Sequence, residues 1–292
     1  KDIQKQIDQI MQGENNRSIP EFEGYSPFEM HQVLNFTFAP NSPVQLQELS
    51  DADFKKVPLL NQLKYLMALI AEKGELKLTA KGFLPTKVVA DIYQQRFLED
   101  VVIKLGISRL YREADSMTVN LTRILLEISG LVKKRKGKLS LTKTGEKMLK
   151  DDFQLLKRIL AVFTEKFNWA YYDGYGDNRI GQTGYGFSLI LLSKYGHKKR
   201  LDSFYAGKYF KAFPQFLDSL EPNYGTLESY SADCYAIRTF DRFLDYLGLI
   251  KIEEVGKRFD RVKYVTKTDL FDRLIKVCPH KNHVLTTNLS AN

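Results

Sequence analysis

The stretch that decides the fold spans residues 121–150 and reads LTRILLEISGLVKKRKGKLSLTKTGEKMLK. Its first part is amphipathic, because apolar residues recur three and four positions apart, as on one face of a helix, at Leu121, Ile124, Leu125 and Ile128. Gly130 is expected to end this helix, and two strand-like pieces follow at residues 131–134 and 139–142. A basic turn at residues 135–138 joins them. Helix, glycine and hairpin in this order predict the second half of a winged helix.

The residues before this stretch predict the first half of the same module. A helical stripe of apolar residues begins at Pro58, and a short strand and a second helix follow it. Ser116 is a candidate cap for the third helix, which is the one that Gly130 ends. We therefore expect a winged-helix-like module over residues 58–150, with an insertion at residues 96–115.

The same order of elements recurs later in the chain. Residues 247–250 (LGLI) follow a predicted helix as residues 129–132 (SGLV) do, and VTKT at residues 265–268 matches LTKT at residues 141–144. The alternative is that Leu-Thr-Lys is simply common where a strand leads into a helix. We interpret residues 180–277 as a second module. The expected fold is thus mainly α with small β-wings, arranged as two tandem winged-helix-like modules.

Three further segments complete the expected organisation. Residues 1–57 form an acidic lead-in that is expected to wrap the body, and residues 278–292 form a C-terminal tail. Residues 151–179 contain a linking helix and then a loop rich in aromatic residues, namely Trp169, Tyr171, Tyr172 and Tyr175. These rings are expected to pack between the two modules, and the alternative is that they stack on nucleic-acid bases.

The net charge of +9 is unevenly distributed. Residues 131–150 hold eight basic residues and one acidic residue, whereas residues 1–57 hold five basic and nine acidic residues. Such a basic cluster attracts polyanions, although a solvated lysine face with no partner is also an explanation of a charge run.

Composition narrows the class of protein. Cys234 and Cys278 are the two cysteines, too few for a disulfide framework, so a reducing compartment such as the cytoplasm is expected. No apolar run reaches the length of about 18 residues that would predict a membrane span. The sequence begins at Lys1 without a methionine, so a removed leader remains an alternative.

A resemblance supports the same fold. The segments LTAKGFLP at residues 78–85, GLVKKRKGK at residues 130–138 and LTKTG at residues 141–145 resemble a group of uncharacterised bacterial proteins with winged-helix-like domains. The similarity covers roughly residues 20–150. It implies a winged-helix fold and a bacterial intracellular setting, and it implies no active site.

Nucleic-acid binding without catalysis is the leading functional hypothesis. In a winged helix the third helix enters the major groove and the wing contacts the backbone. A projection of the first third helix places Asn120 and Arg123 outward as base-reading candidates, and a projection of the second does the same for Tyr235, Arg238 and Arg242. The expected phosphate contacts come from the two wings, at Lys133, Lys134, Arg135, Lys136, Lys138, Lys257, Arg258 and Arg261.

Protein docking is the alternative hypothesis, through Val119 and Leu126 on the outer face of the first third helix. An enzyme is not expected, and neither a cofactor nor a small-molecule substrate is indicated. Residues 173–178 lack the alternating oxygen ligands of a calcium loop, and residues 181–186 lack the Lys-Ser/Thr pair of a phosphate-binding loop. Three metal ligands could come from Cys278, His280 and His283, but a structural zinc site takes four, so we expect no metal.

Overall fold

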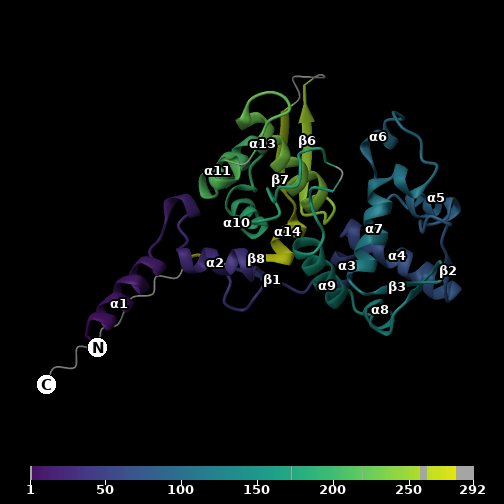
Figure 1. Ribbon diagram of the computed structural model, residues 1–292, viewed down its shortest axis with the longest axis horizontal. Coiled ribbons are helices and arrows are strands. Elements are labelled where there is room, and N and C mark those ends of the chain that lie inside the picture. The colour runs from purple at the N-terminus through teal and green to yellow at the C-terminus, as the bar shows by residue number, and fades with distance from the viewer. Residues whose placement is uncertain (1, 172, 219, 257–261, 281–292) are drawn as a thin grey trace.

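The computed structural model describes residues 2–171, 173–218, 220–256 and 262–280 (Figure 1). It is mainly helical, with small antiparallel sheets, as the sequence predicts. The first half contains α4 (Pro58–Lys73), β2 (Leu76–Lys77), α5 (Thr86–Gln94), α6 (Val101–Lys104), η2 (Glu113–Asp115), α7 (Met117–Ile128), β3 (Val132–Arg135), β4 (Lys138–Leu141) and α8 (Lys143–Met148). Its three strands form a sheet in the order β2-β4-β3.

The second half repeats this order of elements. It contains α10 (Tyr185–Tyr195), β5 (Arg200–Leu201), α11 (Asp202–Ala212), α12 (Gln215–Asp218), α13 (Leu227–Ala236), the π-helical segment η3 (Ile237–Leu244), β6 (Ile250–Val255), β7 (Val262–Lys267) and α14 (Asp269–Leu274). Its sheet has the order β5-β7-β6, which places the short first strand against the second strand of the hairpin in both halves.

The predicted glycine stops are confirmed in both halves. Gly130 has φ +71° and Gly248 has φ +70°, in the left-handed region that glycine adopts readily, and each follows the end of a helix. The threonine that follows each hairpin makes the same contacts: Thr142 Oγ1 donates to the Gly130 carbonyl at 2.8 Å, and Thr268 Oγ1 donates to the Gly248 carbonyl at 2.8 Å. Each threonine also caps the next helix by accepting a backbone N–H. The two halves therefore share this local structure, but the predicted match of LTKT with VTKT is offset by two residues, because Thr142 is the second residue of its motif and Thr268 is the last residue of the other.

The hairpin predicted from residues 131–142 is confirmed, with strand bounds shifted by one residue. Val132 pairs with Leu141 and Arg135 with Lys138 in antiparallel register. The turn is therefore two residues long, and both residues of it, at φ +49° for Lys136 and +70° for Gly137, have the positive angles that suit a tight hairpin turn.

The lead-in and α9 (Asp152–Glu165) complete the architecture. The lead-in contains α1 (Asp2–Asn16), η1 (Pro20–Phe22), α2 (Pro27–Asn35), β1 (Val44–Leu46) and α3 (Asp51–Phe54). β1 pairs antiparallel with β8 (Ile275–Val277), and α2 packs against α10, so these two elements of the lead-in cover the second half. Figure 1 shows α1 projecting away from the body.

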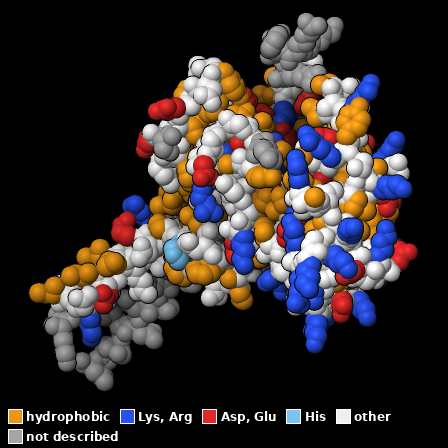
Figure 2. All heavy atoms as spheres, turned by 45° about the vertical axis from the view of Figure 1, so that its right-hand side comes forward, with side chains coloured by type: hydrophobic (Ala, Val, Ile, Leu, Met, Phe, Trp, Pro, Cys, Tyr) orange, Lys and Arg blue, Asp and Glu red, His pale blue; other side chains and the backbone are white. Residues whose placement is uncertain are grey.

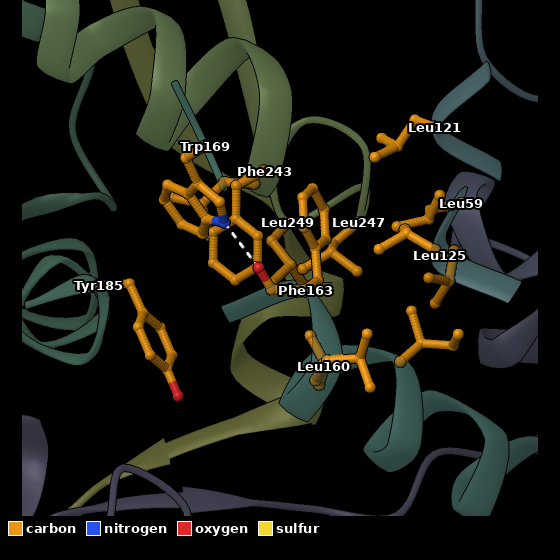
Figure 3. Close-up of a cluster of buried hydrophobic side chains, with 14 of the residues drawn as sticks. Leu59, Leu121, Leu125, Leu160, Phe163, Trp169, Tyr185, Phe243, Leu247 and Leu249 are labelled. Carbon is orange, nitrogen blue, oxygen red and sulfur yellow. Dashed lines mark hydrogen bonds between the residues drawn. The ribbon is translucent and has the colours of Figure 1, made fainter. Parts of the chain in front are cut away.

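Trp169 of the aromatic loop lies in the core between the two halves, as predicted, whereas Tyr175 packs against Tyr224 and Tyr230 of the second half. Tyr172 lies outside the described residues. Trp169 is buried and its indole N–H donates to the Phe163 carbonyl of α9 at 2.7 Å. Its ring lies 4.6 Å, between centroids, from that of Phe243 in η3 (Figure 3). Leucines of α4 and α7 reach the other side of the same cluster, as Figure 3 shows for Leu59 and Leu121. A buried Trp169 is not available to stack on bases.

Candidate nucleic-acid interface

The exposed cations predicted on the first wing lie on the β3–β4 hairpin, as expected from its register. Apolar residues of the hairpin alternate toward the core, and Val132, Leu139 and Leu141 are buried. Every cation of the hairpin is exposed: Lys133, Lys134, Arg135, Lys136 and Lys138. Figure 2 shows Lys and Arg side chains gathered over the half of the molecule that this hairpin belongs to.

Three cations form a row across the exposed face of the sheet. Lys77 of β2 lies opposite Lys138 of β4, and Lys138 lies opposite Arg135 of β3. Directly opposed side chains in antiparallel strands have Cβ atoms about 4.5–5.5 Å apart, so like charges there repel. Lys77 was not among the residues predicted to bind, although its place in a strand that alternates Leu76, Lys77 and Leu78 is a signal that could have identified it.

Little within the protein neutralises this hairpin. Lys138 pairs with Glu75, and both side chains of this pair are half exposed. Lys134 Nζ donates to the Gly82 carbonyl at 3.3 Å. Among the residues that the structure describes, no carboxylate pairs with Lys133, Arg135 or Lys136. Most of the positive charge therefore faces solvent.

The third helix of the first half does not present the face that its projection predicted, which corrects two hypotheses. Val119 and Leu126, the proposed docking residues, are fully buried. Ile128, which was expected to face the core, is exposed. The reason is that α7 has neighbours on several sides, since α4, α5, α9 and η2 all pack against it. The face that was predicted to enter a major groove or to bind a partner is therefore covered, while Ile124, Glu127 and Ile128 of this helix are partly or fully exposed.

Asn120 and Arg123 are also buried, and they belong to an internal polar network centred on Glu113. Glu113 accepts from Asn120 Nδ2 and from Arg123 Nε, both at 2.7 Å, and from the backbone N–H of Leu84 at 2.6 Å. Arg123 also pairs with Glu127 at 2.6 Å. Burial alone would lower the pKa of Arg123, but the hydrogen bonds to the two carboxylates outweigh it and raise the pKa, so the guanidinium stays charged. These side chains are not available to bases.

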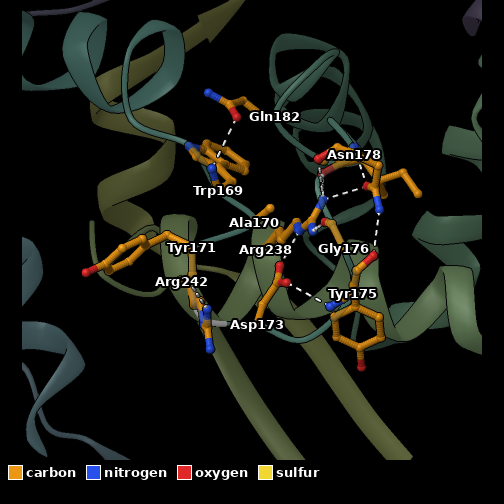
Figure 4. Close-up of polar contacts among 12 residues, drawn as sticks. Trp169, Ala170, Tyr171, Asp173, Tyr175, Gly176, Asn178, Gln182, Arg238 and Arg242 are labelled. Carbon is orange, nitrogen blue, oxygen red and sulfur yellow. Dashed lines mark hydrogen bonds and ion pairs between the residues drawn. The ribbon is translucent and has the colours of Figure 1, made fainter. Parts of the chain in front are cut away.

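The second half corrects the prediction for Tyr235 and Arg238 in the same way. Tyr235 is fully buried and donates to Ser188 Oγ at 2.9 Å. Arg238 is 1% exposed and forms a buried ion pair with Asp173 of the aromatic loop. Its guanidinium also donates to the Gly176 carbonyl at 3.0 Å and to the Asn178 carbonyl at 2.8 Å (Figure 4). Arg238 therefore holds the loop at residues 168–184 in place.

Arg242 is half-buried and helps to join the two halves. It donates to the Tyr171 carbonyl at 3.0 Å (Figure 4). The Tyr171 hydroxyl in turn donates to Asn120 Oδ1 of α7 at 3.2 Å. Asn120 thus contacts Tyr171 of the aromatic loop, and Arg238 and Arg242 donate to backbone carbonyls of the same loop. The sequence predicted all three as base-reading residues.

Sequence reasoning missed Glu113 and Asp173, the acids that hold the buried arginines. Asp173 is 65 residues from Arg238, and no local pattern links residues so far apart. Glu113 is 10 residues from Arg123 but precedes α7, so a projection of α7 alone does not include it.

The second hairpin differs from the first in charge. The cations predicted at its tip, Lys257, Arg258 and Arg261, lie outside the described residues. In the described part, the row that corresponds to Lys77, Lys138 and Arg135 consists of Leu201, Tyr264 and Glu253. Three of the cations around it have acidic partners, Lys199 with Glu253, Lys263 with Asp241, and Lys267 with Asp272, while Lys251 of β6 is exposed.

Residues 55–154, roughly a third of the chain, match the family model of the Y4jL N-terminal domain. This segment contains α4 to α8 and therefore the whole basic hairpin. No curated protein and no solved structure matches the chain. Within the described residues, no helix has the length and apolar character needed to cross a bilayer.

Proposed function

We propose that the protein binds duplex nucleic acid without catalysis, through the phosphate backbone, and that the β3–β4 hairpin with Lys77 is the contact surface. The supporting observation is the row of Lys77, Lys138 and Arg135 on an exposed sheet face, next to Lys133 and Lys136. Opposed like charges destabilise a sheet, and a polyanion bound across the row would relieve that repulsion.

We further propose that the two halves are tandem winged-helix-like modules. The shared element order, the shared sheet topology and the matching Thr142 and Thr268 contacts support this. In this proposal the first module contributes its wing to the complex, while both third helices serve the core. Binding should therefore depend on charge and show little sequence preference, because phosphate contacts carry no sequence information.

The expected salt dependence follows from counterion release. With about three to five phosphates neutralised, the slope of log K against log salt is about −0.9 per phosphate, so affinity falls about 40- to 500-fold between roughly 50 and 200 mM salt. A helix that read bases in the major groove would add a salt-independent, sequence-dependent component, which we do not expect.

The test compares two variants of equal net charge by fluorescence anisotropy with a labelled duplex. One replaces the five hairpin cations by Ala, at Lys133, Lys134, Arg135, Lys136 and Lys138. The other replaces five exposed lysines elsewhere, at Lys55, Lys166, Lys198, Lys211 and Lys251. We expect the hairpin variant to lose affinity by about 100-fold or more and the control by a few-fold. Equal losses would mean that only net charge matters, and undiminished binding by the hairpin variant would remove the hairpin from the site.

A further inference from the structure

The projecting helix α1 carries an uncovered apolar face. Ile3, Ile7 and Ile10 are spaced four and three residues apart, so they lie along one face of the helix, and they are 73%, 44% and 67% exposed. Met11, beside them, is 57% exposed. A helix of 15 residues is marginally stable on its own in water, and most helices in proteins depend on packing of their apolar face. The apolar face of α1 is therefore expected to pack against another surface.

A second apolar surface lies in the insertion between α5 and α7. Its exposed residues are Val101, Val102, Leu105, Ile107 and Tyr111. Together with those of α1 they make nine of the seventeen exposed large hydrophobic side chains among the described residues. Concentration of exposed apolar side chains in two segments is typical of interaction surfaces, whereas single exposed ones are ordinary.

The two surfaces cannot meet within one molecule in this structure. Figure 1 places α1 and α6 toward opposite ends of the longest axis of the protein, with the second half and α9 between them. A contact between them therefore joins two copies of the chain. If each copy offers both surfaces to the other, the contact closes as a symmetric dimer.

The exposed charges of the two segments have opposite sign. The helix Asp2–Asn16 contains three acidic residues and one basic residue. The insertion at residues 96–115 contains four basic and four acidic residues, but one of the acids, Glu113, is buried with Arg123 of α7, which leaves a small positive excess at the surface. In the insertion, Lys104 pairs with Glu99 and Arg112 with Asp115, in contacts that leave both cations largely exposed. Exposed pairs of this kind contribute little, so these cations can exchange partners when an acidic helix approaches.

We propose that α1 of one copy packs its isoleucine face on the insertion at residues 101–111 of a second copy, reciprocally, and that this exchange forms a dimer. The occupant of each surface is thus a second copy of this chain. This contact involves neither the hairpin β3–β4 nor Lys77, so it stands or falls independently of nucleic-acid binding.

The test uses the full chain and sedimentation velocity over a concentration series. An arm variant replaces Ile3, Ile7 and Ile10 by Ser, and an insertion variant replaces Val101, Leu105 and Ile107 by Ser. All six side chains are exposed or half-buried, so both variants should fold, which thermal unfolding can verify. We expect the wild type to dimerise, and each variant alone to bind itself about 100-fold more weakly or not at all.

Complementation provides the decisive measurement. In an equimolar mixture, the intact arm of the insertion variant can pack on the intact insertion of the arm variant, so a heterodimer with one remaining contact should form. A matched control, Val255→Ser with Val262→Ser, removes two exposed apolar side chains elsewhere and should leave the wild-type dimer unchanged.

Four results would overturn the proposal. A wild type that is monomeric up to about 1 mM has no such contact. An insertion variant that still dimerises as the wild type does would indicate that two α1 helices pair with each other. An arm variant that still dimerises would indicate pairing of two insertions. A mixture without heterodimer up to about 1 mM would show that the two surfaces do not bind each other.

Discussion

The two hairpins share a topology but differ in what their exposed faces carry. Across the first sheet the row reads Lys77, Lys138, Arg135, and across the second it reads Leu201, Tyr264, Glu253. The backbone pairing that creates both rows is the same. The difference teaches that fold alone does not assign a surface to a function, because one scaffold supports both a cationic and a nearly neutral face.

The same contrast extends to the other cations of the second half. Within the described residues, Lys194 and Lys208 pair with Glu23, Arg273 pairs with Asp53, and Arg238 is buried with Asp173. Each of these acids comes from the lead-in or from the aromatic loop. These four basic residues of the second half thus connect segments of the chain, whereas the cations of the first hairpin are exposed to solvent.

Replacement of Arg238 should have the largest effect, which is on the free energy of unfolding. It distinguishes a buried, paired cation of the second half from the exposed cations of the first hairpin. Arg238→Ala leaves the Asp173 carboxylate buried without its partner, which costs about 3–5 kcal/mol in the free energy of unfolding. Urea unfolding followed by circular dichroism measures this. The double variant Arg238→Met with Asp173→Leu leaves no unpaired charge and should be less destabilised than the single variant. A stable Arg238→Ala protein that binds duplex poorly would instead restore Arg238 as a nucleic-acid contact.

Neutralising the cationic row should be the next largest effect, and it should act mainly on binding. The triple variant Lys77→Gln, Lys138→Gln and Arg135→Gln is expected to weaken duplex binding by an order of 100-fold at low salt, with a smaller salt slope. The reciprocal change gives the second hairpin a cationic row, by Leu201→Lys, Tyr264→Lys and Glu253→Arg in the neutralised background. We expect it to recover part of the affinity. No recovery would mean that the position of the first hairpin, and not its charge alone, is required.

The sequence predicts the hairpins but not which helix faces are exposed, and the reason is physical. A glycine stop, a basic turn and the alternation of Leu and Lys are local signals, so they predict the helix end at Gly130, the hairpin and the exposure of the wing cations. The two-residue length of the turn came from the structure. The burial of Val119 and Arg238 depends on α9 and on the aromatic loop, which come from distant parts of the chain. A projection that assumes one buried face assigns the opposite face to solvent, and it is wrong for a helix that is covered on several sides.

Glu23 offers a smaller, pH-dependent test of how the second half neutralises its cations. Burial would raise its pKa, but hydrogen bonds from Lys194, Lys208 and Tyr195 outweigh that and lower the pKa below its usual value near 4.5. A carboxyl whose pKa is lowered by folding stabilises the protein above its unfolded pKa, and this contribution is lost as pH falls through the lowered value. Glu23→Gln should therefore reduce stability at pH 7 by about 1 kcal/mol or less and make no difference at a pH below the lowered pKa. Equal destabilisation at both pH values would show that shape, not charge, is what Glu23 provides.

The smallest expected effect is a gain in stability, and it tests whether the first hairpin is strained by its own charge. Arg135 lies opposite Lys138, which itself lies opposite Lys77, and Glu75 compensates only part of this charge. Arg135→Gln keeps a polar, unbranched side chain and removes one repulsion, so it should raise the free energy of unfolding by about 0.2–1 kcal/mol while weakening duplex binding.

Salt distinguishes repulsion from other causes of that gain. At about 1 M salt the screening length falls to about 3 Å, so the stability gain from Arg135→Gln should disappear. Arg135→Lys, which keeps the charge, should leave stability unchanged at either salt concentration. At the corresponding place in the second hairpin, Glu253→Gln loses the contact with Lys199 and should bring no gain. If Arg135→Gln stabilised the protein equally at low and high salt, charge repulsion would not be the cause of the gain. The stability of the first hairpin would then give no support to the proposed polyanion partner.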